Sequence, residues 1–400
     1  FRLHGKKSLA EHNGSRKVVK GRDQLLRIIL GCEAFGTCAG RRDFHRFLLC
    51  SASLWRNFGS MRARLQSVWP PSIVLLGGHL HYPDGAEHPT LTSKYITQGG
   101  SKWHDLPSMP TARSYHAAVT VGTCIYVIGG QEVDDGPVLS SCDCFNLQTR
   151  RWSAMPPMPR LSKAPPAAAV NDKIYVLGKD GDMQAFCISN NSWSTEQRMP
   201  DGRDALEATA LDNCIYVVGS PIAGREASSQ FSCFCPMEGD GMWRVLPDLP
   251  MSRDFGFALL PVAGEICVIG GSSELNTGGS GGLYGIESYK PSRAVWISRP
   301  PLSMARYFHG AAVLQDTLWI FGGVPCADHP RGYDSESPVH NYEMLGVSVT
   351  ELMEEGRRKG PPLNWFGWNT SDSNLFTHES DDENEFCELL NFRTVVNLVD

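Results

Sequence analysis

Short apolar runs that end in glycine recur along the chain between residues 71 and 350. Runs of β-branched and aromatic residues bounded by glycine and proline predict buried β-strands. The runs SIVLLGG, CIYVIGG, KIYVLGK, CIYVVGS, EICVIGG and LWIFGG end at Gly78, Gly130, Lys179, Ser220, Gly271 and Gly323. Successive ends are 52, 49, 41, 51 and 52 residues apart, so the chain repeats one structural unit.

Three further markers keep the same spacing. Tryptophans follow the runs at Trp103, Trp152, Trp193, Trp243 and Trp296. An aromatic residue precedes each of them, at Tyr95, Phe145, Phe186, Phe234 and Tyr289. Arginine lies ten residues after the tryptophan in four of the five copies, at Arg113, Arg203, Arg253 and Arg306. Each unit therefore predicts an apolar strand, a tight turn, the glycine-ended strand, a loop and two more short strands.

The glycines and tryptophans have clear structural roles in such a unit. Glycine at a strand end permits a positive φ or a close backbone approach, and tryptophan buries a large apolar surface. The glycine pairs are Gly77 with Gly78, Gly129 with Gly130, Gly270 with Gly271 and Gly322 with Gly323. One four-stranded sheet cannot bury both of its faces, so the copies must stack, and radial stacking protects the sheet edges.

Together these markers resemble the kelch repeat over about residues 71–350. The resemblance implies an all-β protein, a six-bladed kelch β-propeller with a non-repeat N-terminal arm and an acidic C-terminal tail. The 280 residues from 71 to 350 allow about 47 for each of six blades, a normal size for this repeat. The third and fourth copies lack the second glycine, and the sixth has Tyr342 in place but Val349 where tryptophan is expected.

The two ends of the chain differ in charge from the repeats. Residues 1–70 hold 14 Lys/Arg against 4 Asp/Glu, and residues 351–400 hold 4 against 11. The first segment is interpreted as a poorly ordered basic arm. A degenerate F-box-like helical module over Leu25–Phe58, without its opening Leu-Pro, and an organelle transit peptide remain alternatives. The last ten residues, NFRTVVNLVD, have a β-branched run suited to completing the first blade, as has the segment before Ile73.

Composition narrows the class of partner and compartment. The repeats hold 19 Lys/Arg against 28 Asp/Glu, and this net charge of −9 argues against nucleic-acid binding. No apolar run reaches the ~18 residues that a membrane-spanning helix needs, so no membrane partner is expected. The 13 cysteines are an odd number, and eight of them fall within predicted strands, which favours free thiols, a reducing compartment and a cytoplasmic location, with the nucleus as an alternative.

The sequence predicts no catalytic residue, no metal site and no cofactor. It has neither a CxxC pair nor HExxH, and the loop histidines His79, His81 and His88 lack carboxylates at fixed spacing. Two enzyme families are similar in architecture, the copper radical oxidases and the sialic-acid mutarotases. The second places arginine and glutamate at the channel mouth, so the recurring arginines keep a sugar-directed enzyme open as the alternative function.

Long polar loops follow the glycine pairs and are expected to gather on one face of the propeller, here called the loop face. A rigid scaffold that presents variable loops is typical of a recognition surface. The expected function is therefore a protein-interaction scaffold or substrate-recognition adaptor. The resemblance adds ubiquitin-ligase components as partners, a role that normally comes with a BTB domain, which the sequence does not show. The candidate binding residues are Arg113, Arg203, Arg253, Arg306, His116 and His309, with a hydrogen-bonding role between blades as the alternative for each.

Overall fold

The computed structural model describes the repeats and parts of the region that follows them. The described residues are 72–81, 87–97, 103–133, 136–202, 204–220, 229–236, 241–273, 282–325, 344–354, 365–368, 388–389 and 395–397. The arm at residues 1–70, with its F-box-like stretch, lies outside them. So does most of the acidic tail.

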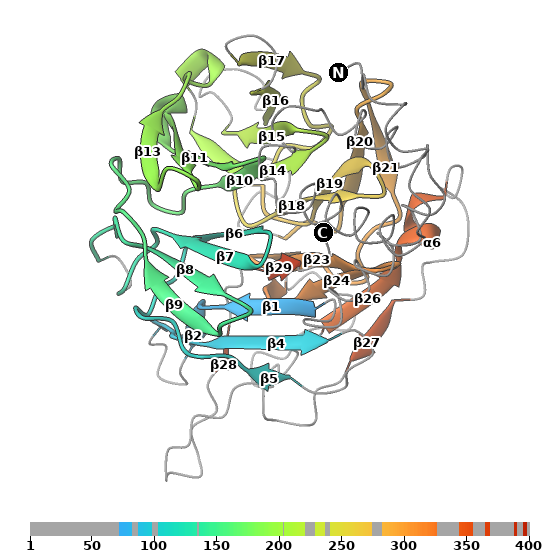
Figure 1. Ribbon diagram of the computed structural model, residues 1–400. Helices are drawn as coiled ribbons and strands as arrows, with labels where there is room; N and C mark the ends of the chain where they lie inside the picture. Colours follow the sequence, from blue (N-terminus) through green and yellow to red (C-terminus); the bar gives the residue numbers. More distant parts are fainter. Residues whose placement is uncertain are drawn as a thin grey trace, which may run out of the picture. The chain divides into compact units, whose positions relative to one another are not determined.

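Six antiparallel four-stranded sheets form the blades of a β-propeller, numbered here in chain order (Figure 1). Blade one contains β29 (Val395–Asn397), β1 (Ser72–Leu76), β4 (Ser93–Thr97) and β5 (His104–Asp105). Blade two contains β6 (Ala117–Val121), β7 (Cys124–Ile128), β8 (Cys142–Asn146) and β9 (Arg151–Ala154). Blade three contains β10 (Ala167–Val170), β11 (Lys173–Leu177), β12 (Met183–Cys187) and β13 (Ser192–Thr195).

The remaining blades repeat this order. Blade four contains β14 (Ala205–Leu211), β15 (Cys214–Gly219), β16 (Gln230–Cys235) and β17 (Met242–Leu246). Blade five contains β18 (Ala258–Val262), β19 (Glu265–Ile269), β20 (Ile286–Lys290) and β21 (Val295–Arg299). Blade six contains β23 (Gly310–Leu314), β24 (Thr317–Phe321), β26 (Met344–Ser348) and β27 (Phe366–Trp368). The prediction of an all-β, six-bladed propeller is confirmed.

Smaller elements lie between and beside the blades. Strands β2 (His79–His81), β3 (Glu87–Pro89) and β28 (Glu388–Leu389) form one small sheet, and β22 (Arg306–Tyr307) pairs with β25 (Val324–Pro325). The helical elements among the described residues are η1 (Lys179–Gly181), η2 (Pro200–Gly202) and α6 (Val349–Met353). None of the helices in this part of the chain is both long and apolar enough to cross a membrane.

The first blade takes a strand from near the end of the chain. Strand β29 pairs antiparallel with β1, and Val74 lies opposite Val396 (Figure 1). The β-branched run noted at the C-terminal end of the sequence contains this strand. Its pairing covers an edge of β1 that would otherwise expose unpaired backbone groups.

The sixth blade extends beyond the boundary expected at residue 350. Its outer strand is β27, and the tryptophan expected at Val349 is instead Trp365, whose indole donates to the carbonyl of Pro301 at 3.2 Å. The same indole-to-linker bond recurs from Trp152, Trp193, Trp243 and Trp296 to the preceding linkers, at 2.8–3.0 Å. Fixed spacing failed here because α6, which begins at Val349, is inserted before the fourth strand.

The hydrophobic core lies between neighbouring sheets rather than within one centre. Ile269 and Ile286 of blade five pack in one cluster with Leu318 and Val347 of blade six, and all four are buried. The other described interfaces have equivalent clusters. Each blade therefore depends on its neighbours for burial, as expected for stacked repeats.

Candidate functional site

The arginine that opens blade two is a structural residue. The side chain of Arg113 is 0% exposed and donates hydrogen bonds to the carbonyls of Gly129 and Ser141, at 2.9 and 3.0 Å. It also forms an ion pair with Asp143 at 2.7 Å. Its own carbonyl accepts a hydrogen bond from the amide of Gly78 in the preceding blade. Arg113 therefore connects two blades.

Arg253 occupies an equivalent place in blade five. Its side chain is 0% exposed, donates to the carbonyl of Gly270 at 2.8 Å and is ion-paired with Glu287. Burial lowers the pKa of this arginine, and the adjacent Glu287 carboxylate opposes that shift. An ion pair enclosed in this way is expected to hold the loop and the strands of the blade together.

The buried positions of Arg113 and Arg253 do not fit the surface binding role that was expected for the recurring arginines. Arg306 is also buried and donates to the carbonyl of Gly322 at 2.8 Å, while Arg203 lies outside the described residues. A buried guanidinium that is bonded to its own blade cannot meet a partner at the surface. The sequence showed that the arginines recur, but it could not show which way their side chains point.

The two candidate histidines are buried between blades. His116 and His309 are 4% and 2% exposed, and each follows its arginine by three residues. Burial, with the nearby positive charges of Arg113 and Arg306, lowers the pKa of both histidines to about 3. Both imidazoles are therefore neutral near physiological pH, and both are almost fully buried, although both residues belong to the lining of the cavity described below.

The glycine pairs make room for these histidines. Gly77 has a φ of +60°, and a Cβ added there would lie 2.5 Å from both the Arg113 carbonyl oxygen and His116 Cε1. Gly270 has a φ of +55° and would meet the equivalent atoms of Arg306 and His309, each at 2.7 Å. Glycine is thus required at these two strand ends, because residues at the start of the next blade pack directly against them and leave no room for a Cβ.

The low histidine pKa predicts a loss of stability in mild acid. The unfolded chain binds a proton at each histidine below a pKa of ~6.5, whereas the folded protein does so only near 3. The free energy of unfolding should therefore fall by about 1.4 kcal/mol per histidine between pH 7.5 and pH 5.5. Urea denaturation at pH 7.5 and 5.5 measures this loss.

The matched variant for this prediction is His309→Gln, which removes one buried imidazole. Its pH-dependent loss should be smaller than that of the unchanged protein by the same amount. His104→Gln, which alters an exposed histidine, should keep the full loss. An equal loss in all three proteins would show that the buried histidines do not cause it.

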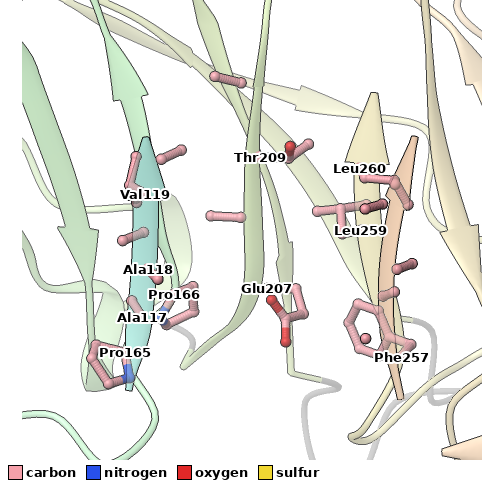
Figure 2. Close-up of a pocket in the computed structure, with 18 of the residues that line it drawn as sticks. Ala117, Ala118, Val119, Pro165, Pro166, Glu207, Thr209, Phe257, Leu259 and Leu260 are labelled. Atoms are coloured by element: carbon pink, nitrogen blue, oxygen red, sulfur yellow. The ribbon is translucent and has the colours of Figure 1, made fainter. Parts of the chain in front are cut away.

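A cavity runs along the inner strands of blades two to six. Its volume is about 340 Å³, and β6, β10, β14, β18 and β23 contribute its described lining. Most of its lining side chains are small and apolar, chiefly alanine and proline. Figure 2 shows the carboxylate of Glu207, on β14, directed into this space. Glu207 matches no repeat marker, so the repeat pattern gave no signal for it.

Exposed apolar side chains mark the loop face. Because neighbouring strands of a blade run in opposite directions, the end of the second strand and the start of the first strand lie at the same face. Leu91 and Val133 belong to the loops that follow the second strands of blades one and two, and Leu161 belongs to the linker before blade three. Their exposed fractions are 42%, 52% and 58%. These residues, unlike the arginines, are available to a partner.

One pair of cysteines differs from the expectation of free thiols. Cys214 and Cys235 form a disulfide between β15 and β16 of blade four. Cys214 precedes Ile215 and Cys235 follows Phe234, and because Ile215 and Phe234 lie opposite each other in the antiparallel pair, the two cysteines lie side by side at the strand ends. The equivalent partner of Cys124 in blade two is Asn146, so that blade has no matching disulfide. The six other described cysteines are not disulfide-bonded.

Metal binding finds no support in the described part of the chain. No three His, Cys, Asp or Glu side chains there come close enough together to hold a metal ion. The side chains of His79, His81 and His88 lie outside the description.

Comparisons with known proteins agree with the fold. The model of the Kelch motif matches residues 112–159, which comprise blade two. Kelch-like protein 23 of Homo sapiens is 27% identical over 252 residues, covering 60% of this chain and 42% of that protein. The chain is a kelch-repeat protein.

Other relatives extend the kelch assignment. Kelch-like protein 35 of Mus musculus is 26% identical over 242 residues, which cover 57% of this chain and 40% of that relative. Beta-scruin of Limulus polyphemus is 24% identical over 249 residues, which cover 61% of this chain and 23% of beta-scruin. The kelch chain therefore spans less than half the length of these relatives.

Proposed function

We propose that this kelch protein is an interaction scaffold or substrate-recognition adaptor that binds a partner protein through its loop face. The observation that carries the proposal is the exposure of Leu91, Val133 and Leu161 on that face. Large apolar side chains that are exposed on the loops of one face favour a protein-binding site. The described residues also include three such side chains on outer strands, Met242, Val245 and Val295.

The finer assignment is a substrate receptor of a ubiquitin ligase, with ligase components as additional partners and the cytoplasm or nucleus as the compartment. Its support is the similarity to kelch-like proteins, since a kelch propeller that selects a substrate must leave its loop face open. The chain spans only part of those relatives, so the ligase role is a proposal for the whole protein.

Binding is favoured over catalysis. The alternative function, a sugar-directed enzyme of the mutarotase type, requires arginines whose side chains converge at the channel mouth. Of the four recurring arginines, Arg113, Arg253 and Arg306 are bonded inside the blades instead, at 0–3% exposure, and Arg203 lies outside the described residues. Their burial takes away the residues on which the enzyme alternative relied.

Affinity capture with the full chain tests the proposal. The informative variant is Val133→Asp combined with Leu161→Asp, which adds charge to two exposed loop-face positions. Val245→Asp is the matched control, because Val245 is 59% exposed on an outer strand. A partner that binds the unchanged protein and the control but not the double variant supports the proposal. A partner lost equally from both variants, or retained by both, contradicts it.

A further inference from the structure

Blade four has a disulfide at a position where the other blades have no pair of cysteines. Cys214 is the first residue of β15 and Cys235 the last of β16, so the bond joins the open end of this hairpin, on the face opposite the loop face. The equivalent pairs are Ser72 with Thr97, Cys124 with Asn146, Lys173 with Cys187, Glu265 with Lys290 and Thr317 with Ser348. A blade of this propeller therefore folds without a covalent bond here.

Two of the other blades hold the same strand ends with a non-covalent contact. In blade two Asn146 donates a hydrogen bond to Sγ of Cys124 at 3.6 Å, and in blade five the ammonium group of Lys290 lies 3.6 Å from the carboxylate of Glu265. The disulfide of blade four adds a restraint that these contacts lack, because it closes a ring between residues that are 21 apart in sequence. Closing such a ring restricts the unfolded chain and so stabilises the folded one.

The two cysteines of the bond differ in exposure. Cys214 is half-buried and directly follows Asp212 and Asn213, which are exposed in the turn between β14 and β15. Cys235 is 3% exposed and belongs to the core cluster that blade four shares with Phe257 and other residues of blade five. A small thiol in solution can therefore approach Cys214 more easily than Cys235. Disulfides that can be approached in this way are typically labile, whereas structural disulfides resist reduction.

These features suit a bond that changes with the redox state of its surroundings. We propose that Cys214 and Cys235 form a redox-sensitive clasp, which reduced glutathione opens and glutathione disulfide closes. Disulfides of proteins in reducing compartments are mostly transient or redox-sensing. The proposal therefore agrees with the cytoplasm or nucleus as the compartment, and it adds a regulatory device to the proposed interaction scaffold.

Opening of the clasp takes two exchange steps. The thiolate of one glutathione attacks Sγ of Cys214, forms a mixed disulfide with it and releases Cys235 as a thiolate, which takes up a proton. A second glutathione thiolate attacks the glutathione sulfur of the mixed disulfide, releases the Cys214 thiolate and leaves as glutathione disulfide. Two glutathione thiols are oxidised and one protein disulfide is reduced. The reverse steps, with glutathione disulfide as the oxidant, close the clasp.

Reduction should loosen blade four where it packs against blade five. Without the bond, the open end of the hairpin is held by strand pairing and by the core cluster around Cys235 alone. Amide hydrogen exchange should therefore become faster in β15 and β16, because segments with fewer restraints open more often. Strands β7 and β8 of blade two, which have no disulfide, should keep their exchange rates.

Differential alkylation of the full chain tests the proposal. The protein is incubated with an excess of reduced glutathione or of glutathione disulfide, alkylated, and digested for mass spectrometry. Cys214 and Cys235 should be alkylated after the first treatment and protected as a disulfide after the second. The equilibrium constant for unfolding in urea should rise on the order of a hundredfold when the bond is reduced.

Two variants show whether this bond causes the response. Cys187→Ser is the matched control, because Cys187 occupies in blade three the place of Cys235 and is not disulfide-bonded, so this variant should keep the full response. Cys214→Ser combined with Cys235→Ser should unfold at the urea concentration of the reduced protein with either form of glutathione.

Three results would overturn the proposal. A bond that stays intact in excess reduced glutathione would be a permanent structural disulfide. Cysteines that stay open to alkylation in glutathione disulfide would show that the bond does not form. Reduction that changes neither unfolding nor the exchange rates of β15 and β16 would show that the bond does not act as a clasp. If the double serine variant does not fold, alkylation and exchange of the unchanged protein still decide.

Discussion

Replacing Arg253 by methionine should lower the free energy of unfolding by about 3–5 kcal/mol. The substitution leaves Glu287 buried without its ion-pair partner and removes donors from the carbonyls of Gly270 and Met251. A charge that is buried and unpaired costs far more than the pair itself contributes. Urea denaturation of the full chain measures the loss.

Two companion variants locate the cause of that loss. Arg160→Met breaks an ion pair whose arginine is 48% exposed, and it should cost less than about 1 kcal/mol. Combining Arg253→Met with Glu287→Met removes both charges and should cost less than Arg253→Met alone. If Arg253→Met weakened partner binding while leaving stability unchanged, Arg253 would be a binding residue after all.

The repeat could be predicted from sequence because each blade solves the same packing problem. The apolar runs, the glycine pairs and the tryptophans are local requirements, so their spacing indicated six blades. Trp365 was missed because an insertion before the last strand broke that spacing. Spacing alone cannot correct for such an insertion, whereas the indole bond to the preceding linker identifies the residue.

The sequence could not predict which way the candidate side chains point. An arginine at a loop position is compatible with a surface role or with a buried ion pair, and only its partner decides. Asp143 and Glu287 lie about 30 residues downstream, at positions that no motif joins to Arg113 or Arg253. Glu207 could not be identified from the repeat because it occurs in one blade only, at a position where blades two, five and six have alanine or glycine.

The second large effect is expected at Gly270. Replacing it by alanine should lower the free energy of unfolding by at least about 3 kcal/mol, since the new Cβ combines left-handed backbone strain with a close contact. The added atom would lie 2.7 Å from both the carbonyl oxygen of Arg306 and His309 Cε1, so blade six would have to move.

Gly264→Ala separates the two causes. Gly264 also has a positive φ, +79°, but an added Cβ would have no atom within 4 Å. This variant should cost only the backbone strain, about 1–2 kcal/mol. Urea denaturation of both variants then gives the contact term by difference. Equal losses of unfolding free energy in the two variants would mean that blade six moves away from the new Cβ at no measurable free-energy cost. A larger loss at Gly270 would show that this glycine sets the distance between blades five and six, where blade six begins with Arg306 and His309.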